Sequence, residues 1–304
     1  MLNGLLFVVV PLVMGYLFKT QQITLLKKID SSCQLLVSII LALMGLSLAR
    51  MDELGQNLTQ ILQISGVLFI CISSCNLLAL PILDRLWNEK TKGKKAKIPL
   101  KSALINASKL VLTVGVGLVV GLIIDHFYAN SLNWVDTASE SVLFVLLVLI
   151  GINLRNSAMP IKQMLLNVHG ITLALWVLIS SLLGGIIAAY WLSIPINQGL
   201  AMASGFGWYS LTGILITDHF GPVLGSAAFL NELLRELIAL IFIPILIGRY
   251  PSTAIGYAGA TAMDFTLPVI QQSGGNDCVP SAIISGFILS LLVPVLVVTF
   301  ATMA

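Results

Sequence analysis

Long apolar runs constrain what this chain can fold into more than any other feature of its sequence. A helix of about 20 apolar residues crosses the roughly 30 Å hydrocarbon layer of a bilayer. Only 10% of the residues are charged and 58% are hydrophobic, whereas about a quarter of a soluble domain is charged. We therefore expect an all-α polytopic membrane protein in the lipid bilayer, with no soluble domain and no nucleic-acid partner. The clearest runs lie at 2–18, 33–49, 61–83, 103–124, 141–154, 170–192, 223–248 and 279–300.

Two further stretches, 197–217 and 253–272, are apolar but interrupted by Gly, Ser, Thr and Pro. Either stretch could cross the membrane fully or re-enter from one side, and hydropathy does not distinguish these cases. We favour about eight transmembrane helices plus two broken or re-entrant segments. If both stretches cross fully, the chain has ten spans.

Basic residues alternate between the connections of these runs and predict the orientation of the chain. The third connection, "RLWNEKTKGKKAKIPLK" (85–101), carries seven Lys and Arg residues, whereas the second holds only Arg50 beside Asp52 and Glu53. Cytoplasmic loops are enriched in Lys and Arg. We therefore expect the odd connections inside and both termini on the outer, periplasmic side. The other basic residues of the odd connections are Lys19, Lys27, Lys28, Arg155 and Lys162.

The chain also repeats itself. "LALMGLSLAR" (41–50) is echoed by "LVLIGINLRN" (147–156), and "ICISS" (70–74) is echoed by "WVLISS" (176–181). The repeating unit holds three spans, an odd number, so the second copy must lie upside down relative to the first. This is the inverted-repeat plan of secondary transporters.

A second pair of related segments lies downstream. "LIALIFIPILI" (237–247) resembles "FILSLLVPVLV" (287–297), and each follows one of the broken stretches. We expect a single transporter domain over 1–304, with inverted three-helix repeats at 1–83 and 103–192 and a second repeat pair at 197–248 and 253–300.

Ionisable residues inside the run 225–247 point to a functional site. Glu232, Arg235 and Glu236 lie near its middle, flanked by Asn231. A charged side chain at mid-membrane costs roughly 2.5–3.5 kcal/mol to insert, so the three must face a polar cavity or one another. Residues three and four apart share a helix face, which lets Arg235 neutralise one glutamate in a structural network.

One ion pair leaves one glutamate over, and Asp264 in the second broken stretch is another unpaired acid. Two carboxylates in the membrane form a negative site that attracts a cation. We therefore expect Glu236 and Asp264 to bind substrate or protons. Glu232, Arg235 and Asn231 are further candidate residues of this site, and Glu232 remains open between a structural and a functional role. Pro268 disfavours a helical residue before it, so the chain around Asp264 should be non-helical, with a turn at "QQSGG" (271–275).

The first broken stretch offers a second kind of chemistry. Its glycines permit unwinding, its aromatic rings attract ammonium groups, and broken helix ends present free N–H groups to carboxylates. A ligand with an α-carboxylate and ammonium groups fits this set, although a glycine-rich packing turn with interfacial aromatics is an equally weighted alternative. Asp218 and His219 should lie at the solvent end. The expected lining residues are Trp208, Tyr209, Ser210, Gly205, Gly207, Thr266 and Asp218.

Common enzyme signatures are absent. The chain contains no HExxH, GxSxG, P-loop or GxGD motif, so we expect neither an enzyme nor a cofactor. Cys71 and Cys75 are one helical turn apart and could hold a metal, but small buried thiols are the favoured interpretation.

Several long motifs resemble the LysO family of bacterial lysine exporters. They are "LAMASGFGWYSLTGILITDHFGPVLGSAAFLNELLRELIAL" and "GATAMDFTLPV", with "PLVMGYL", "MGLSLA", "IGINLRN" and "GFILSLLVPVL" elsewhere. The resemblance covers the whole chain. It implies a cytoplasmic-membrane exporter of L-lysine that also protects against toxic analogues such as thialysine. It further implies outward-facing termini and a functional pair of membrane acids, which map onto Glu236 and Asp264.

Together these features predict lysine export by alternating access, coupled to an inward proton. The ε-ammonium would face Glu236 or Asp264, and the carboxylate would face backbone N–H groups of a broken segment. The alternatives are an inorganic cation (Na⁺)/proton antiporter and, from another class, a membrane enzyme or scaffold.

Overall fold

The computed structural model describes residues 10–20, 22–49, 54–87, 100–127, 134–156 and 167–303. Helices account for the regular structure of these residues, and the described ranges contain no β-strand. Residues 10–16 are helical within the first expected span. Arg50, Asp52, Glu53, Lys162 and most of the basic third connection lie outside the described residues.

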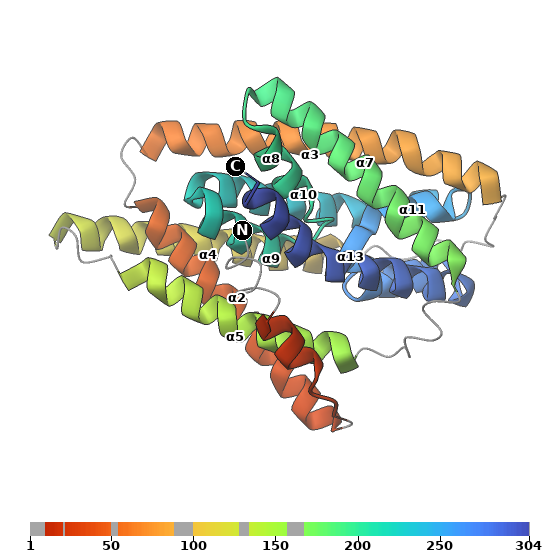
Figure 1. Cartoon of the computed structure of the whole chain (residues 1–304), viewed down its shortest axis with the longest axis horizontal. Helices are drawn as coiled ribbons and strands as arrows, with labels where there is room; N and C mark the ends of the chain where they lie inside the picture. The colour runs from red at the N-terminus through yellow and green to blue at the C-terminus, as the bar shows by residue number, and fades with distance from the viewer. Residues whose placement is uncertain are drawn as a thin grey trace.

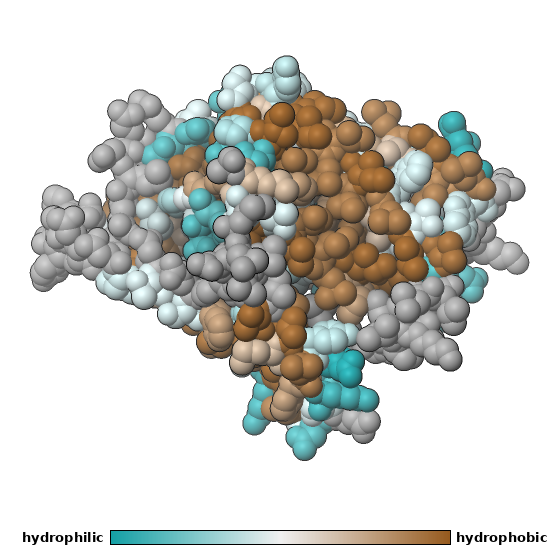
Figure 2. Space-filling view, viewed as in Figure 1, coloured by the Kyte–Doolittle hydropathy of each residue, from teal (hydrophilic) through white to brown (hydrophobic). Residues whose placement is uncertain are grey.

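Each later apolar run forms a helix (Figure 1). Their bounds are α2 Ile23–Ala49, α3 Leu54–Trp87, α4 Leu100–Phe127, α5 Trp134–Asn156, α7 Val168–Leu192, α10 Pro222–Leu246 and α13 Val279–Ala301. Four stretches within the described chain are long and apolar enough to cross a bilayer: Thr24–Ala49, Asn57–Trp87, Val168–Leu192 and Asn276–Ala301. Apolar side chains cover much of the face over α7 and α13, and hydrophilic ones gather where α2 begins (Figure 2). The expectation of an all-helical membrane protein is confirmed.

Both interrupted stretches are broken helices, as the sequence predicts. The first consists of α8 (Ile196–Ala203) and α9 (Tyr209–Phe220), and the second of α11 (Pro251–Ala258), the 3₁₀ turn η1 (Gly259–Met263) and α12 (Leu267–Gly274). A further 3₁₀ turn, η2 (Asn276–Cys278), leads into α13.

The two breaks lie against each other. The backbone N–H of Ala260 donates a 2.9 Å hydrogen bond to the carbonyl oxygen of Phe206. Gly259 has a φ of 63°, and a Cβ there would lie 2.1 Å from that same oxygen. Glycine is therefore required where the backbones of the two broken segments meet.

The described helices form two groups. The first contains α2, α4 and α5, which pack on one another, and the second contains α3, α7 and the segments from α8 to α13 (Figure 1). The groups contact each other through α9 and α10. An apolar cluster of Leu41 and Met44 from α2 with Phe229 and Leu233 from α10 lies at this boundary.

Glycines bring helix backbones together inside the first group. A Cβ at Gly45 of α2 would lie 2.2 Å from the carbonyl oxygen of Val114 in α4. A Cβ at Gly117 of α4 would lie 2.2 Å from the carbonyl oxygen of Ala42. Each glycine therefore meets the carbonyl three residues before the other, and only a hydrogen in place of a side chain allows this approach.

The same reciprocal contact occurs between the first helix and α5. A Cβ at Gly151 would lie 2.1 Å from the carbonyl oxygen of Leu12, and one at Gly15 would lie 1.9 Å from that of Val148. Again each glycine meets the carbonyl three residues before its partner. Gly45 and Gly151 are the glycines at matching positions of the two echoed sequences.

Candidate functional site

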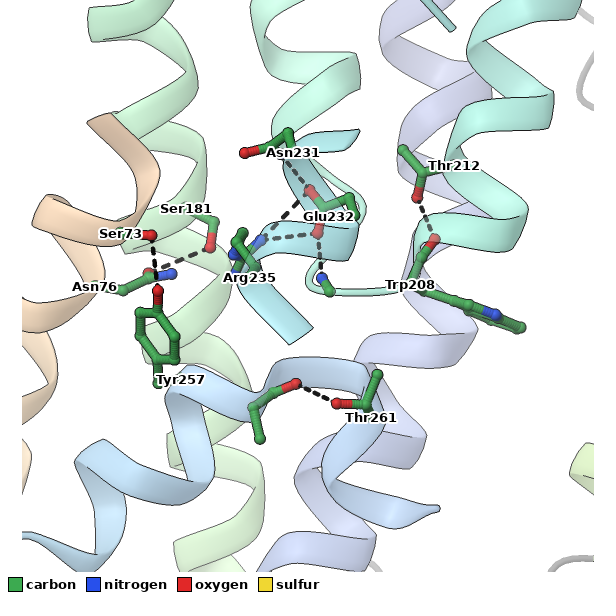
Figure 3. Close-up of polar contacts among 12 residues, drawn as sticks. Ser73, Asn76, Ser181, Trp208, Thr212, Asn231, Glu232, Arg235, Tyr257 and Thr261 are labelled. Carbon is green, nitrogen blue, oxygen red and sulfur yellow. Dashed lines mark hydrogen bonds and ion pairs between the residues drawn. The ribbon is translucent and has the colours of Figure 1, made fainter. Parts of the chain in front are cut away.

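Glu232 is the centre of a buried hydrogen-bond network on α10 (Figure 3). Arg235 Nη1 lies 3.1 Å from Glu232 Oε2, and Asn231 Nδ2 donates to Oε1 at 2.8 Å. The backbone N–H of Gly207, in the break between α8 and α9, also donates to Oε2. The Glu232 and Arg235 side chains are both fully buried, so this ion pair is shielded from lipid and water.

The network fixes the first break to α10. A Cβ at Gly205 would lie 2.8 Å from Glu232 Cδ, so Gly205 allows the break to approach the carboxylate. Glu232 thereby accepts from a backbone N–H that the interrupted helix leaves without an intrahelical partner. Of the two roles left open for Glu232, this geometry favours the structural one.

Glu236 lies one turn further along α10 in a different environment. It is 6% exposed, and it makes no hydrogen bond or ion pair with any other described residue. Arg235 is engaged by Glu232, so within the described part of the chain Glu236 has no cation bound to it. A buried carboxylate without a partner is costly in a membrane, and such a group is a candidate for binding a mobile cation.

Asp264 lies close enough to Glu236 for their charges to interact. It is located between η1 and α12 and is exposed. The backbone N–H of Phe265 donates to Asp264 Oδ1 at 2.5 Å. The predicted non-helical segment around Asp264 is confirmed, and the structure brings this acid to the site of Glu236.

Tyr209 and Asp30 belong to the same electrostatic cluster. Tyr209 is the first residue of α9, and it lies close enough to Glu236 and Asp264 to feel their charges. The charge of Asp30 in α2 in turn interacts with that of Asp264. Three acids and a tyrosine from separate elements therefore converge where the two helix groups meet. Among the described residues, no group of three or more His, Cys, Asp or Glu side chains has the geometry to hold a metal ion.

The sequence analysis overlooked Asp30. It follows Lys27 and Lys28, and this charged stretch looks like a polar connection that precedes a span at 33–49. In the structure α2 begins at Ile23, so Asp30 is a helical residue. The helix is longer than the apolar run because charged residues at a membrane interface remain compatible with a helix.

The aromatic residues of the first break lie at the start of α9. Trp208 precedes the helix and accepts a 2.8 Å hydrogen bond at its carbonyl oxygen from Thr212 Oγ1. The Tyr209 ring contacts Phe229 edge-on, with a centroid distance of 5.6 Å. Ser210 follows and is half-buried. Of these residues, Tyr209 belongs to the electrostatic cluster with Glu236 and Asp264, so the start of α9 lies beside the two acids.

Two other expected lining residues occupy different positions. Asp218 pairs with His219 at 3.5 Å, nine residues after Tyr209 and thus about 13 Å further along α9. Asp218 is exposed, which agrees with a solvent-end location rather than with the acidic cluster. Thr266 is fully buried and donates from Oγ1 to the carbonyl oxygen of Thr261 at 3.0 Å, so it shapes the second break.

The predicted turn at 271–275 is wrong. Pro268 lies in the first turn of α12, and the helix continues to Gly274. Proline is tolerated in the first turn because the N–H that it lacks would have no intrahelical partner there. The helix ends instead at Gly275, which has a φ of 86°.

Asp84 is a second acid that the sequence analysis overlooked, and unlike Asp30 it is buried. It lies near the end of α3, and its two oxygens accept hydrogen bonds from the N–H groups of Ser252 at 2.7 Å and Thr253 at 2.9 Å. It thus caps the first turn of α11 and is fully engaged there. The sequence did not reveal this role because Asp84 lies at the polar end of an apolar run, where an acid resembles an interface residue. The four cysteines are free thiols: Cys33, Cys71, Cys75 and Cys278.

Comparison with known proteins places the chain in a family. The family profile described as lysine exporter LysO matches residues 111–301. "Lysine exporter LysO" of Escherichia coli strain K12 is 49% identical over 302 residues, covering 99% of this chain and 100% of the relative. A "Putative lysine exporter" of Haemophilus influenzae is 44% identical over 184 residues, 60% of this chain and 94% of that protein. No solved structure matches the chain. Both the family profile and the full-length relative show that this chain belongs to the LysO family of lysine exporters.

Proposed function

We propose that the protein exports L-lysine across the cytoplasmic membrane by alternating access, in exchange for protons. The observation that carries this proposal is Glu236, a buried carboxylate without a partner among the described residues, beside Asp264 at a broken helix. Membership of the lysine exporter family and the names of the relatives support the choice of substrate.

The acidic pair can couple two fluxes because an ammonium group and a proton satisfy the same carboxylate. A charged carboxylate without a partner is unfavourable away from water, so the occluded site requires one of these two occupants. Lysine bound from the cytoplasm displaces protons, and protons from outside displace lysine. This competition gives antiport without any covalent chemistry.

Proton entry also offsets an electrical cost. Lysine carries a net positive charge, and moving one charge outward against an inside-negative potential costs about 2.3 kcal/mol per 100 mV. An inward proton moves one charge in the favourable direction. One-for-one exchange would therefore be electrically neutral, and the pH gradient would drive export.

The arrangement of the helices supports alternating access. The acidic cluster lies where the first and second helix groups meet, at α9 and α10. Gly45 and Gly151 make equivalent contacts, which supports repeats at 1–83 and 103–192. In the plan of secondary transporters such repeats have opposite orientations. In this topology both termini lie on the periplasmic side, and the pair 197–248 and 253–300 supplies the two breaks.

Thialysine fits the same mechanism. It differs from lysine by a sulfur in place of one side-chain methylene, and it keeps the carboxylate and both ammonium groups. A site that recognises the charged ends would accept it, so the protein would also remove this toxic analogue from the cell.

The test is counterflow of labelled L-lysine in proteoliposomes that contain only the purified protein. Labelled lysine should accumulate in vesicles preloaded with unlabelled lysine, and an imposed pH gradient should drive net movement. Vesicles that exchange Na⁺ for protons but do not move lysine would instead support the inorganic cation antiporter. Protein-free vesicles provide the control.

A further inference from the structure

Arg235 uses only part of its hydrogen-bonding capacity. Its Nη1 atom bonds to Glu232 at 3.1 Å, while Nε and Nη2 are buried and have no hydrogen-bond partner in the described structure. The residue as a whole is 1% exposed. Buried charged donors without partners are rare in native proteins, so these two atoms require an explanation.

The two free atoms form one edge of the guanidinium group. Nε–H and the neighbouring Nη2–H point in the same direction in the plane of the group, and this spacing matches the two oxygens of a carboxylate. The opposite side of the group is held by Glu232. The ion pair therefore orients a two-donor fork and leaves it available for a planar anion.

A further unpaired donor lies in the same polar region. Asn76 Oδ1 accepts hydrogen bonds from Ser180 at 2.6 Å and Ser181 at 3.2 Å, which orients its amide. The Nδ2 atom of Asn76 is buried and has no partner in the described structure. Figure 3 draws Asn76 and Tyr257 on the side of Arg235 away from Glu232, and the Arg235 charge reaches Tyr257. This side of the arginine is thus rich in donors.

We propose that Arg235 binds the α-carboxylate of the transported amino acid through Nε and Nη2. This inference rests on the proposed function and specifies how it selects an amino acid. Arg235 and Glu236 are adjacent on α10, so one helix holds both kinds of charged group that lysine requires. A simple anion is a poor occupant because Glu232 already neutralises the arginine and Glu236 adds a negative charge nearby.

The inference also revises where the carboxylate binds. The sequence predicts that a backbone N–H of a broken segment binds the carboxylate, but the N–H of Gly207 already donates its hydrogen bond to Glu232. The first break therefore acts on the substrate indirectly, by fixing the Glu232 carboxylate that orients Arg235.

The experiment compares three ligands on the purified full-length protein: L-lysine, lysinamide and 1,5-diaminopentane, which is lysine without its carboxylate. Competition with labelled lysine in counterflow gives the apparent affinity of each. Lysine should compete at least about tenfold better than the other two, because 1,5-diaminopentane leaves the buried fork unpaired and lysinamide offers it only one uncharged acceptor oxygen. Equal competition by all three ligands on the wild-type protein would overturn the inference.

The variant Arg235→Lys keeps a positive charge beside Glu232 but lacks the two-donor edge. It should bind lysine at least about tenfold more weakly and leave the affinity for 1,5-diaminopentane unchanged. The matched control is Arg249→Lys, because Arg249 is an exposed residue stacked on Tyr250. Retention of lysine selectivity in Arg235→Lys would overturn the inference.

The outcomes separate this inference from the function on which it rests. Lysine counterflow by the wild-type protein without discrimination against 1,5-diaminopentane would refute the role of Arg235 and leave lysine export standing. Complete absence of lysine counterflow by the wild-type protein would refute both. If Arg235→Lys does not fold, the wild-type comparison of the three ligands still decides.

Discussion

Two glutamates one turn apart on α10 have opposite surroundings. Glu232 bonds to Arg235, Asn231 and the backbone of Gly207, whereas Glu236 makes no such contact with the described residues. The same residue type on the same helix can thus be held in a buried ion pair, as Glu232 is, or be left for the role that we propose for Glu236 in transport. Partners, rather than depth in the membrane, distinguish the two.

This difference predicts opposite effects on stability. Glu232→Gln removes the counter-charge of buried Arg235, and breaking a buried pair costs about 3–5 kcal/mol. Glu236→Gln removes a charge that has no partner in the described part of the protein, so the free energy of unfolding should be unchanged or higher. Thermal unfolding in detergent measures both. Equal destabilisation by the two variants would contradict the assignment.

The same pair of acids predicts the loss of transport. Glu236→Gln and Asp264→Asn remove a charge that attracts ammonium and a group that releases protons, so lysine counterflow should fall at least tenfold, which corresponds to about 1.4 kcal/mol or more. Asp218→Asn is the matched control because Asp218 is an exposed acid paired with His219. Wild-type counterflow in either Glu236→Gln or Asp264→Asn would refute the proposed site.

Among the elements, the two broken helices owe their geometry to backbone contacts. The carbonyl of Phe206 accepts from Ala260, and Gly259 faces the same oxygen. The positions of Asp264 and Gly207 in the site both depend on this crossing, because each lies within five residues of it.

Gly259→Ala should therefore prevent the breaks from meeting. The added Cβ would lie 2.1 Å from the Phe206 carbonyl oxygen, at a φ of 63°. Gly275→Ala is the control, since Gly275 has a φ of 86° but no atom within 4 Å of its Cβ position. The control should lose about 1–3 kcal/mol from backbone strain alone. The yield of folded monodisperse protein should collapse only for Gly259→Ala, and equal yields would contradict the crossing.

Sequence reasoning located the elements better than their contacts. Apolar runs and glycine-rich interruptions predict the helices and both breaks because the membrane demands apolar length and internal backbone hydrogen bonds. The partners of the charged side chains were harder to predict. Arg235 is near both Glu232 and Glu236 in sequence, and it pairs with Glu232, which the N–H of Gly207 also holds in place. Asp30 and Asp84 were overlooked because acids at the ends of apolar runs resemble interface residues.

At the scale of the whole molecule, the prediction concerns orientation. Met303 at the C-terminal end and Lys28 at the start of α2 are both exposed. In a cysteine-free background, Met303→Cys and Lys28→Cys would mark opposite sides of the membrane in the proposed topology. A membrane-impermeant thiol reagent added to intact cells should label Met303→Cys and not Lys28→Cys. The reverse labelling pattern would invert the proposed topology and with it the direction assigned to transport.

The paired glycines of the first helix group have a mechanical consequence. Where Gly45 meets Gly117 and Gly15 meets Gly151, main chains touch directly, and sliding either helix by one residue would drive a Cβ into a carbonyl. The first contact joins α2 to α4, the second joins the first helix to α5, and α2 also packs on α5, so these four helices form one stiff block. Displacement is easier at the boundary lined by Met44 and Phe229, where side chains can change rotamer. Asp30 belongs to this block and Glu236 to the neighbouring helix group, so a movement at this boundary would change the distance between two acids of the electrostatic cluster.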